Sequence, residues 1–319
     1  MISSFFMHHA PTSFFVRTIG IVLLIYVLWQ VDVRAVFEVL SSVHPLYFLI
    51  ALFLLLLSSF IGMLKWDTLV SAQQVRLPKR VLLKYYWIGM FLGMVTPGKL
   101  GEFWRARYLV DAGRLEMPKA FGTVLLDRGV DLAVIVMVGA AALAYVFVFP
   151  FGAFWWSVAA LSVLMGSVYL FRRFWDADFI QKGVSFLWRG FLFLLRRQQG
   201  SPRESAAQAK DFFRTAFSKR AWFYGILYFV LTVAAYYALA LSLSLAVPFF
   251  YLFLAVGLVN LLLLAPITVL GLGTRETSYI FLLGIVHITA SEAVAFSTLV
   301  LLSGMIVSVP GGFFLLKNV

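Results

Sequence analysis

Two short segments of the chain combine helix-breaking residues with charged side chains, the pattern best suited to holding an anionic group. Within the first, the candidate residues are Pro97, Gly98, Lys99, Gly101, Glu102, Arg105 and Arg107. A guanidinium presents a planar fork of donors to phosphate, and backbone N–H groups exposed by glycine add to it. The segment therefore predicts a site for phosphate or a lipid headgroup. The alternative is an interfacial turn whose arginines extend into water at the membrane surface.

The second segment repeats this pattern with Gly271, Gly273, Arg275 and Glu276. Aligning Leu272-Gly273 with Leu100-Gly101 places it over the first segment. Its two charged residues lie between the apolar runs 261–272 and 279–286. Ionisable side chains at membrane depth are costly, so they face a cavity or pair with one another, and they are candidates for function. The alternative is an arginine–glutamate pair that only fixes the local fold.

A third group is formed by Asp127, Arg128 and Asp131 at the start of a long apolar run. On a helix, residues four apart lie on the same face, so the two aspartates point the same way. The apolar part that follows places the group at or just inside the inner membrane interface. It could pair with Arg105 or Arg107, relay protons or form a purely structural ion network.

Composition identifies the setting in which these residues act. The chain has 319 residues, of which 62% are hydrophobic and only 13% charged, and its mean hydropathy is +0.95. A soluble domain carries about 25% charged residues, and this chain lacks the charge to cover a water-exposed surface. These values exclude soluble, disordered and nucleic-acid-binding proteins. Because the chain has no cysteine and its four histidines are scattered, we expect no metal site and no cofactor.

The elements that position the charged groups are predicted to be membrane helices, each needing about 20 apolar residues. The first apolar window has no cleavage pattern after it and is read as a retained span. Two further windows, 81–97 and 249–289, are interrupted by proline and glycine, which a continuous helix does not accommodate. We expect them to be broken helices or re-entrant hairpins. The six uninterrupted windows are 14–31, 45–64, 120–149, 150–171, 222–246 and 292–316.

Basic residues orient these elements. Segments 65–84, 98–119 and 172–220 carry five, five and eleven lysines and arginines out of 26 in the chain, so the positive-inside rule makes them cytoplasmic. Six spans then leave both termini in the cytoplasm. The two hairpins would enter from opposite faces, which is the pattern of an inverted repeat with a substrate site where they meet.

We therefore predict an all-α polytopic membrane protein with six full transmembrane helices and two broken or re-entrant helical hairpins. It forms a single domain. The first half, 1–171, holds a hairpin near 81–115, and the second half, 221–319, holds a hairpin near 249–289. The connector 172–220 contains a helix, 179–197, with a stripe of cations, which we expect to lie on anionic lipids of the inner leaflet. A further span is the alternative for 179–197.

With these motifs in place, the chain resembles the lysylphosphatidylglycerol synthase transmembrane-region family, also described as flippase-like integral membrane proteins. The resemblance covers residues 14–316. In that family the first motif is commonly Pro-Gly-Gly-x-Gly-Glu followed by arginine, whereas Lys99 replaces a glycine here. The third is commonly Pro-Gly-Gly-x-Gly-x-Arg-Glu, whereas this chain has Val269-Leu270 in place of Pro-Gly. The middle motif usually has glutamate before arginine, where this chain has Asp127.

The resemblance implies a protein that helps to move lipids or lipid-linked molecules across the cytoplasmic membrane. Synthase members carry a soluble catalytic domain after the membrane region; this sequence ends at Val319, so we expect no transferase activity and no enzyme. No Walker motif is present, so ATP would not drive transport directly. The alternatives are a non-catalytic partner or scaffold of a lipid synthase or glycosyltransferase and, third, a membrane-embedded lipid-phosphate enzyme using Asp127 and Asp131. The expected partners are a phospholipid or polyprenyl-linked lipid, without nucleic acid.

Overall fold

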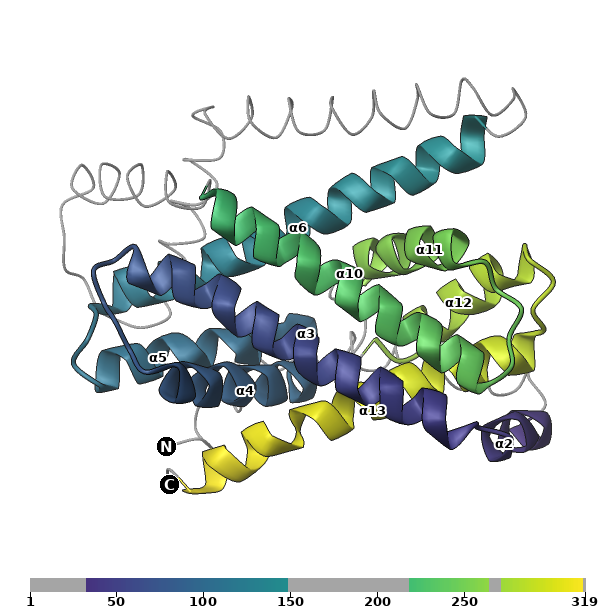
Figure 1. Ribbon diagram of the computed structural model, residues 1–319, viewed down its shortest axis with the longest axis horizontal. Helices are drawn as coiled ribbons and strands as arrows, with labels where there is room; N and C mark the ends of the chain where they lie inside the picture. Colours follow the sequence, from purple (N-terminus) through teal and green to yellow (C-terminus); the bar gives the residue numbers. More distant parts are fainter. Residues whose placement is uncertain (1–32, 149–217, 264–270, 318–319) are drawn as a thin grey trace, which may run out of the picture.

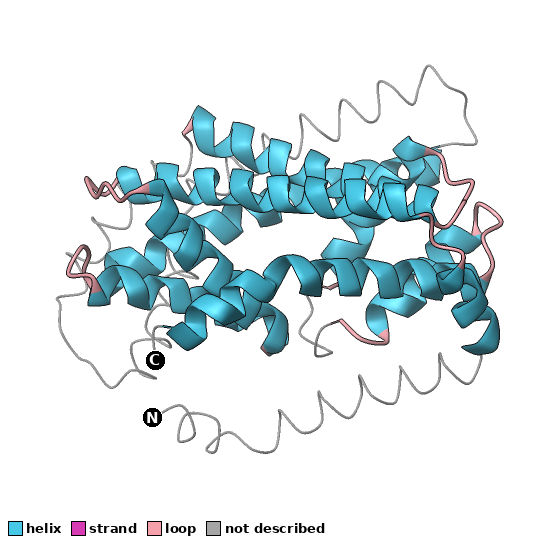
Figure 2. Cartoon of the chain, turned by 60° about the horizontal axis from the view of Figure 1, so that its bottom comes forward, coloured by secondary structure: helices cyan, strands magenta, loops and turns pink. Residues whose placement is uncertain are grey.

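The structure is a computed structural model that describes residues 33–148, 218–263 and 271–317. Within these ranges all regular structure is helical (Figures 1 and 2). The first half contains α2 (Val33–Ser41), α3 (Pro45–Ser71), α4 (Lys79–Val95), the 3₁₀ helix η1 (Pro97–Phe103), α5 (Trp104–Asp111) and α6 (Met117–Val148). The second contains α10 (Lys219–Ser242), α11 (Phe249–Leu262), α12 (Thr274–Gly284) and α13 (Ala290–Lys317).

In the part of the chain that the structure describes, three helices are long and apolar enough to cross a membrane: α3, α10 and α13. They coincide with the expected spans 45–64, 222–246 and 292–316. The expected span 120–149 forms the 32-residue helix α6. The expected spans 14–31 and 150–171, and the connector helix 179–197, lie outside the described residues, so the total of six spans stays a prediction.

Serine hydroxyls within the apolar helices are satisfied locally. Ser58 and Ser59 donate to the carbonyl oxygens of Leu55 and Leu56, and Ser303 donates to Val300. A hydroxyl that returns to the carbonyl three or four positions earlier needs no water, so it costs little in an apolar setting.

Both interrupted windows form antiparallel helical hairpins. In the first, the chain reverses at η1, so that Tyr85 of α4 stacks on Tyr108 of α5 with ring centroids 5.0 Å apart. A Cβ at Gly101 would overlap the carbonyl of Leu92, which shows how closely η1 folds back on α4. In the second hairpin, the hydroxyl of Tyr251 on α11 donates to the carbonyl oxygen of Leu282 on α12. The chain therefore reverses at the first predicted break. The proline of the second break lies in 264–270, outside the described residues, so re-entry of the hairpins into the membrane stays a prediction.

The two halves pack in matching ways. The long helices α3 and α10 lie side by side (Figure 1), and they are antiparallel, because the N–H of His44 donates to the carbonyl oxygen of Ser242 at 2.8 Å. The α4–α13 pair corresponds to the α6–α11 pair, and α5–α6 corresponds to α12–α13. Exchanging the halves leaves this set of pairs unchanged, as in an approximate two-fold axis through the α3–α10 pair.

Backbone conformation repeats between the halves as well. Left-handed residues occur at both hairpin breaks, Lys99 with φ 57° and Gly271 with φ 71°. Before the hairpins they occur at Gln74 (φ 61°) and Ser244 (φ 56°), and after them at Gly113 (φ 63°) and His287 (φ 64°). The partners in these three pairs are 170 to 174 residues apart, close to the 172 residues that separate Leu100-Gly101 from Leu272-Gly273. Two halves of equivalent connection that pack through antiparallel helices have the internal arrangement of an inverted repeat.

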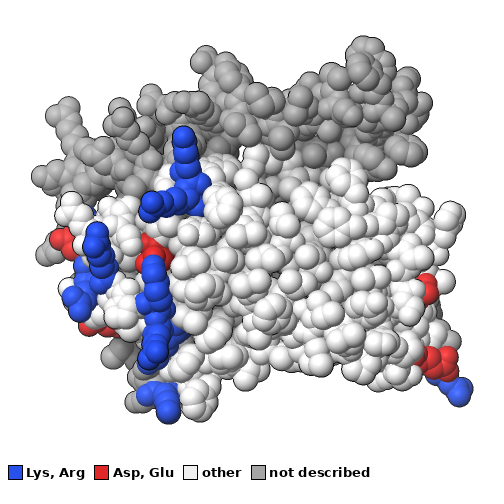
Figure 3. Space-filling model, viewed as in Figure 1, with Lys and Arg blue, Asp and Glu red and all other residues white. Residues whose placement is uncertain are grey.

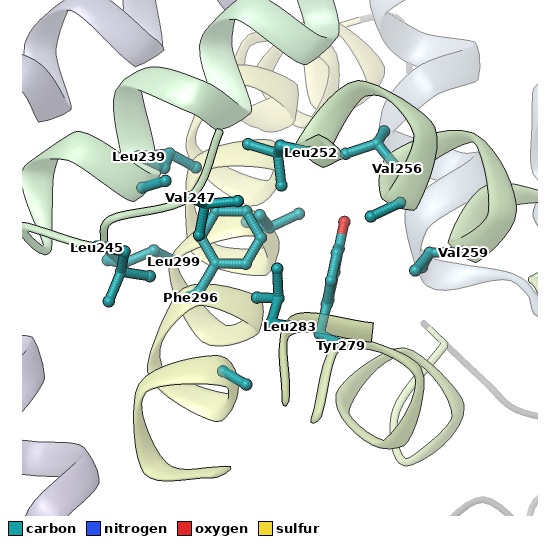
Figure 4. Close-up of a cluster of buried hydrophobic side chains, with 14 of the residues drawn as sticks. Leu239, Leu245, Val247, Leu252, Val256, Val259, Tyr279, Leu283, Phe296 and Leu299 are labelled. Atoms are coloured by element: carbon teal, nitrogen blue, oxygen red, sulfur yellow. The ribbon is translucent and has the colours of Figure 1, made fainter. Parts of the chain in front are cut away.

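The two halves also share a buried core, to which α3 contributes Ala51 and α6 contributes Val134 and Met137. Figure 4 shows side chains from α10, α11, α12 and α13 meeting in one apolar cluster, where the rings of Tyr279 and Phe296 lie edge to face with centroids 5.1 Å apart. This cluster fixes the second hairpin against α13.

Most of the lysine and arginine side chains on the visible face gather at one end of the molecule, over the N-termini of α4 and α10. A few charged side chains lie at the opposite end, and the middle of this face shows no Lys, Arg, Asp or Glu (Figure 3). Lys79, Arg80, Lys219 and Arg220 begin these two helices. A basic end beside a band without charged residues is typical of a membrane protein.

Candidate functional site

Six charged side chains meet inside the first half, where four elements converge. They come from α3, η1, α5 and α6, and we call them the six-charge cluster: Lys65, Glu102, Arg105, Asp127, Arg128 and Asp131. Three are cations and three are carboxylates, so their formal charges cancel. Buried charges in a membrane domain are tolerated when they neutralise one another in this way.

Asp127 is the centre of the cluster. Its carboxylate is fully buried and pairs with Arg105, with Arg128 at 3.0 Å and with Lys65 at 3.1 Å. Its backbone carbonyl also accepts a hydrogen bond from Lys65 at 3.3 Å. The carboxylate of Asp131, one turn later on α6, pairs with both Lys65 and Arg128. The helical spacing seen in the sequence therefore does place both acids on one face, where they bind cations from other helices.

Arg105 is held between two aromatic rings. Its guanidinium carbon lies 4.8 Å from the centroid of Trp66 and 5.1 Å from that of Tyr86, and the residue is 1% exposed. Glycines on α4 make room for it, because a Cβ at Gly89 would lie 3.3 Å from Cδ of Arg105. Cation–π contact and ion pairing act together on this side chain, so it is fixed in place.

Arg128 makes the most open links in the cluster, with Glu102 and with Asp131. Nη1 of Arg128 lies 2.9 Å from Oε2 of Glu102, and the two side chains are 24% and 10% exposed. Nη2 of the same arginine lies 2.9 Å from Asp131. Among the described residues, Nε of Arg128 and Nε of Arg105 have no hydrogen-bond acceptor. Each of these two arginines thus has an N–H donor without an acceptor, and Arg128 is the most exposed cation of the cluster.

A smaller cluster lies at the second hairpin. Nε of Arg275 donates to Oγ of Ser297 at 2.8 Å, and Nη2 donates to Oε1 of Glu276 at 2.7 Å. Ser297 also donates to Oε1 of Glu276 at 2.9 Å, while Oε2 accepts the N–H of Gly273 at 2.6 Å. We call Arg275, Glu276 and Ser297 the two-charge cluster; it too is buried and neutral.

The two clusters occupy corresponding places in the two halves. Arg105 bonds to Asp127, which is 22 positions later in the chain, and Arg275 bonds to Ser297, also 22 positions later. In each half an arginine on the second helix of the hairpin therefore binds the long helix that follows. Tyr228 and Tyr236 of α10 lie beside the first and second cluster respectively. Eight helical residues span about 12 Å. The two clusters therefore lie about 12 Å apart along α10 and form two distinct sites.

The residues predicted from the sequence fall into three groups. Glu102, Arg105, Asp127, Arg128 and Asp131 join the six-charge cluster, and Gly273, Arg275 and Glu276 join the two-charge cluster. The backbone breaks are formed by Pro97, Gly98, Lys99, Gly101 and Gly271.

Arg107 lies apart from both clusters. Its side chain is exposed and pairs with Asp111 one turn later, with Nε 2.9 Å from Oδ1. Since Arg105 is buried in the six-charge cluster, the two arginines of the first motif occupy different surroundings.

Lys65 was not expected in the site. The charge count assigned it to a cytoplasmic segment, but α3 continues to Ser71 and the side chain of Lys65 is fully buried. A lysine inside the continuous apolar helix was the available signal. Ser297 was also not expected, and an isolated serine in an apolar helix gives no comparable signal.

Comparison with known proteins places these features in a family. A family model described as the lysylphosphatidylglycerol synthase TM region matches residues 14–312. A UPF0104 membrane protein from Methanothermobacter thermautotrophicus is 30% identical over 129 residues, covering 38% of each chain. A second, from Pyrococcus horikoshii, is 24% identical over 122 residues, covering 37% of this chain and 36% of the relative. The matches thus span less than two fifths of either relative, and no solved structure matches.

Proposed function

The chain belongs to the lysylphosphatidylglycerol synthase transmembrane-region family, and we propose that it moves an anionic lipid or lipid-linked molecule across the cytoplasmic membrane without direct use of ATP. The observation that carries the proposal is the pair of helical hairpins. Each hairpin breaks inside an apolar segment and places a buried arginine against the following long helix.

Broken helices are tolerated in a bilayer where protein or a water-filled cavity satisfies their backbone, and in transporters with inverted repeats such breaks form the substrate site. Here a side chain at position 101 would overlap Leu92, so only glycine fits. The N–H of Gly101 donates to Oγ1 of Thr96 at 2.6 Å. The break is thus stabilised by the hairpin itself, which supports its placement at membrane depth.

The proposed orientation follows from the charged end of the molecule. The ends of α3 and α5 and the starts of α4, α6 and α10 lie at this end and carry most of the exposed basic residues. The positive-inside rule assigns it to the cytoplasm. On this orientation both termini are cytoplasmic, and we expect 172–220 to bind anionic inner-leaflet lipids.

We propose transport in preference to catalysis because the acids of the cluster are already engaged. An enzyme with Asp127 and Asp131 as metal ligands or bases needs carboxylates that face a substrate. In the described residues, Asp127 is fully buried and binds three cations.

The second candidate is a non-catalytic partner of a lipid synthase or glycosyltransferase. It is favoured by one observation, that both clusters are neutral and closed by mutual pairing. Such clusters can also serve only to fix the fold.

Reconstitution with labelled lipids tests the proposal and separates the two candidates. Arg275→Lys keeps the positive charge but loses the fork that binds Ser297 and Glu276 together. A translocator should lose about tenfold in lipid transfer rate, as for loss of one charged hydrogen bond, with little change in melting temperature. A scaffold should tolerate the substitution.

Arg107→Lys is the matched control, because Arg107 makes an exposed pair with Asp111, and its transfer rate should be unchanged. Labelled lipids of several headgroup classes, anionic and zwitterionic, are compared in vesicles with and without protein. If transfer is no faster than in empty vesicles for every class, the translocator proposal is wrong.

A further inference from the structure

One carboxylate of the six-charge cluster differs from the other two. The pairs of Asp127 with Lys65 and Arg105 are closed off from the surroundings, with side-chain exposures of 0% or 1%. The pairs of Arg128 with Glu102 and with Asp131 are both partly exposed. Asp131 also binds Lys65, whereas Arg128 is the one ion-pair partner of Glu102 among the described residues. Arg128 would keep its place without Glu102, because Asp127 and Asp131 on its own helix also hold it at 3.0 and 2.9 Å. Glu102 is therefore the carboxylate that can leave while the cluster stays assembled.

The charge balance defines what could replace it. Without Glu102, three cations remain against two carboxylates, which leaves one uncompensated positive charge. A single monoanion restores neutrality, which a buried membrane site requires. A phosphodiester is such a monoanion, and an arginine binds it through the same donors that bind a carboxylate. Nε of Arg128, without an acceptor among the described residues, gives the incoming group a further donor.

We propose that Glu102 is an internal substitute for the substrate: it occupies Arg128 until the phosphodiester of an anionic lipid takes its place. This inference rests on the proposed transport function and identifies its substrate group as a monoanionic lipid phosphodiester. Glu102 is then a specificity-determining residue, because its departure sets the number of charges that the ligand must bring.

The surroundings of Arg128 favour a lipid over a free phosphodiester. One turn further along α6 the side chain of Leu132 is 42% exposed, and Val136 follows on the same face. The hairpin break itself exposes Val95, Leu100 and Trp104. A cation with exposed apolar side chains beside it suits a lipid, whose anionic headgroup can bind the cation while its acyl chains contact the apolar side chains.

Binding to the purified full-length protein tests this directly. The probe is dioctanoyl phosphatidylglycerol, a monoanionic phosphodiester lipid, compared with zwitterionic dioctanoyl phosphatidylcholine and with dimethyl phosphate, which has no acyl chains. Glu102→Gln removes the competing charge and should bind the anionic lipid about tenfold more tightly, the value of one charged hydrogen bond.

Asp111→Asn is the control, because it removes an exposed carboxylate from the same hairpin and should leave affinity unchanged. Weaker or equal binding by a folded Glu102→Gln protein overturns the proposal. Tighter binding supports it, because damage to the fold does not increase affinity. Equal affinity for dimethyl phosphate overturns the assignment of a lipid, and equal affinity for phosphatidylcholine overturns the monoanion requirement. If the binding results hold but vesicles show no lipid transfer, the transport function fails and the binding inference stands.

Discussion

The burial of Lys65 predicts a large loss of stability when its charge is removed. In Lys65→Met, the six-charge cluster keeps two cations and three carboxylates, so one negative charge is left unpaired in a buried site. Removing one partner of a buried ion pair costs about 3–5 kcal/mol. For a chain of this length 1 kcal/mol corresponds to about 2 °C in melting temperature, so we expect a fall of about 6–10 °C.

Lys79 gives the matched control. It also pairs with a carboxylate, that of Asp67, but its side chain is 55% exposed, so Lys79→Met should cost at most about 1 kcal/mol. Adding Asp131→Asn to Lys65→Met restores two cations and two carboxylates and should recover at least half of the lost stability. Thermal unfolding of the purified protein in detergent measures all four proteins. Equal melting temperatures for the two lysine variants, or a double variant less stable than Lys65→Met, would refute the reasoning.

Two further predictions address the fold that positions the clusters. Gly101→Ala should destabilise the protein by about 3 kcal/mol, the upper range for overpacking, because its Cβ would overlap the carbonyl of Leu92. Gly284→Ala has open space around it and should change the melting temperature little. Equal effects of the two substitutions would contradict the hairpin. The chain has no cysteine, so cysteines placed at His44 and Ser242, whose backbones hydrogen-bond at 2.8 Å, should be joined by a short bifunctional reagent within one molecule. Failure to join them in folded protein would contradict the antiparallel α3–α10 pair.

The two hairpins occupy equivalent places in the two halves, but the charge clusters that they carry differ in size. The first binds its long helix through six charges and the second through two, with Ser297 where the first half has Asp127. Breaking the first requires separating more ion pairs, and Glu102 is the member that can separate while the others stay paired. If Glu102 is exchanged for a phosphodiester as we propose, this difference assigns the ligand to the first hairpin, with the second as the simpler counterpart.

Sequence alone located the chain breaks and one face of the site. Proline and glycine act through local backbone geometry, so the reversals at Pro97 and Gly271 could be predicted without knowledge of the neighbouring helices. The spacing of Asp127 and Asp131 likewise fixed their common face, because helical periodicity is local. The same periodicity explains why Arg105 and Arg107 separate, since residues two apart on a helix point in nearly opposite directions.

Only the tertiary structure decided which charges meet. Lys65 is 62 positions from Asp127, and Ser297 is 22 positions from Arg275; nothing in local sequence fixes such distances. Their partners follow from the packing of α3 and α13, which depends on where glycines allow close approach, as at Gly62 of α3 beside Tyr86 and Gly311 of α13 beside Trp87. The abundance of basic residues indicated orientation because hydration and the membrane potential act on each exposed charge separately. The buried charges were different, since each depends on a neutralising partner that folding brings to it.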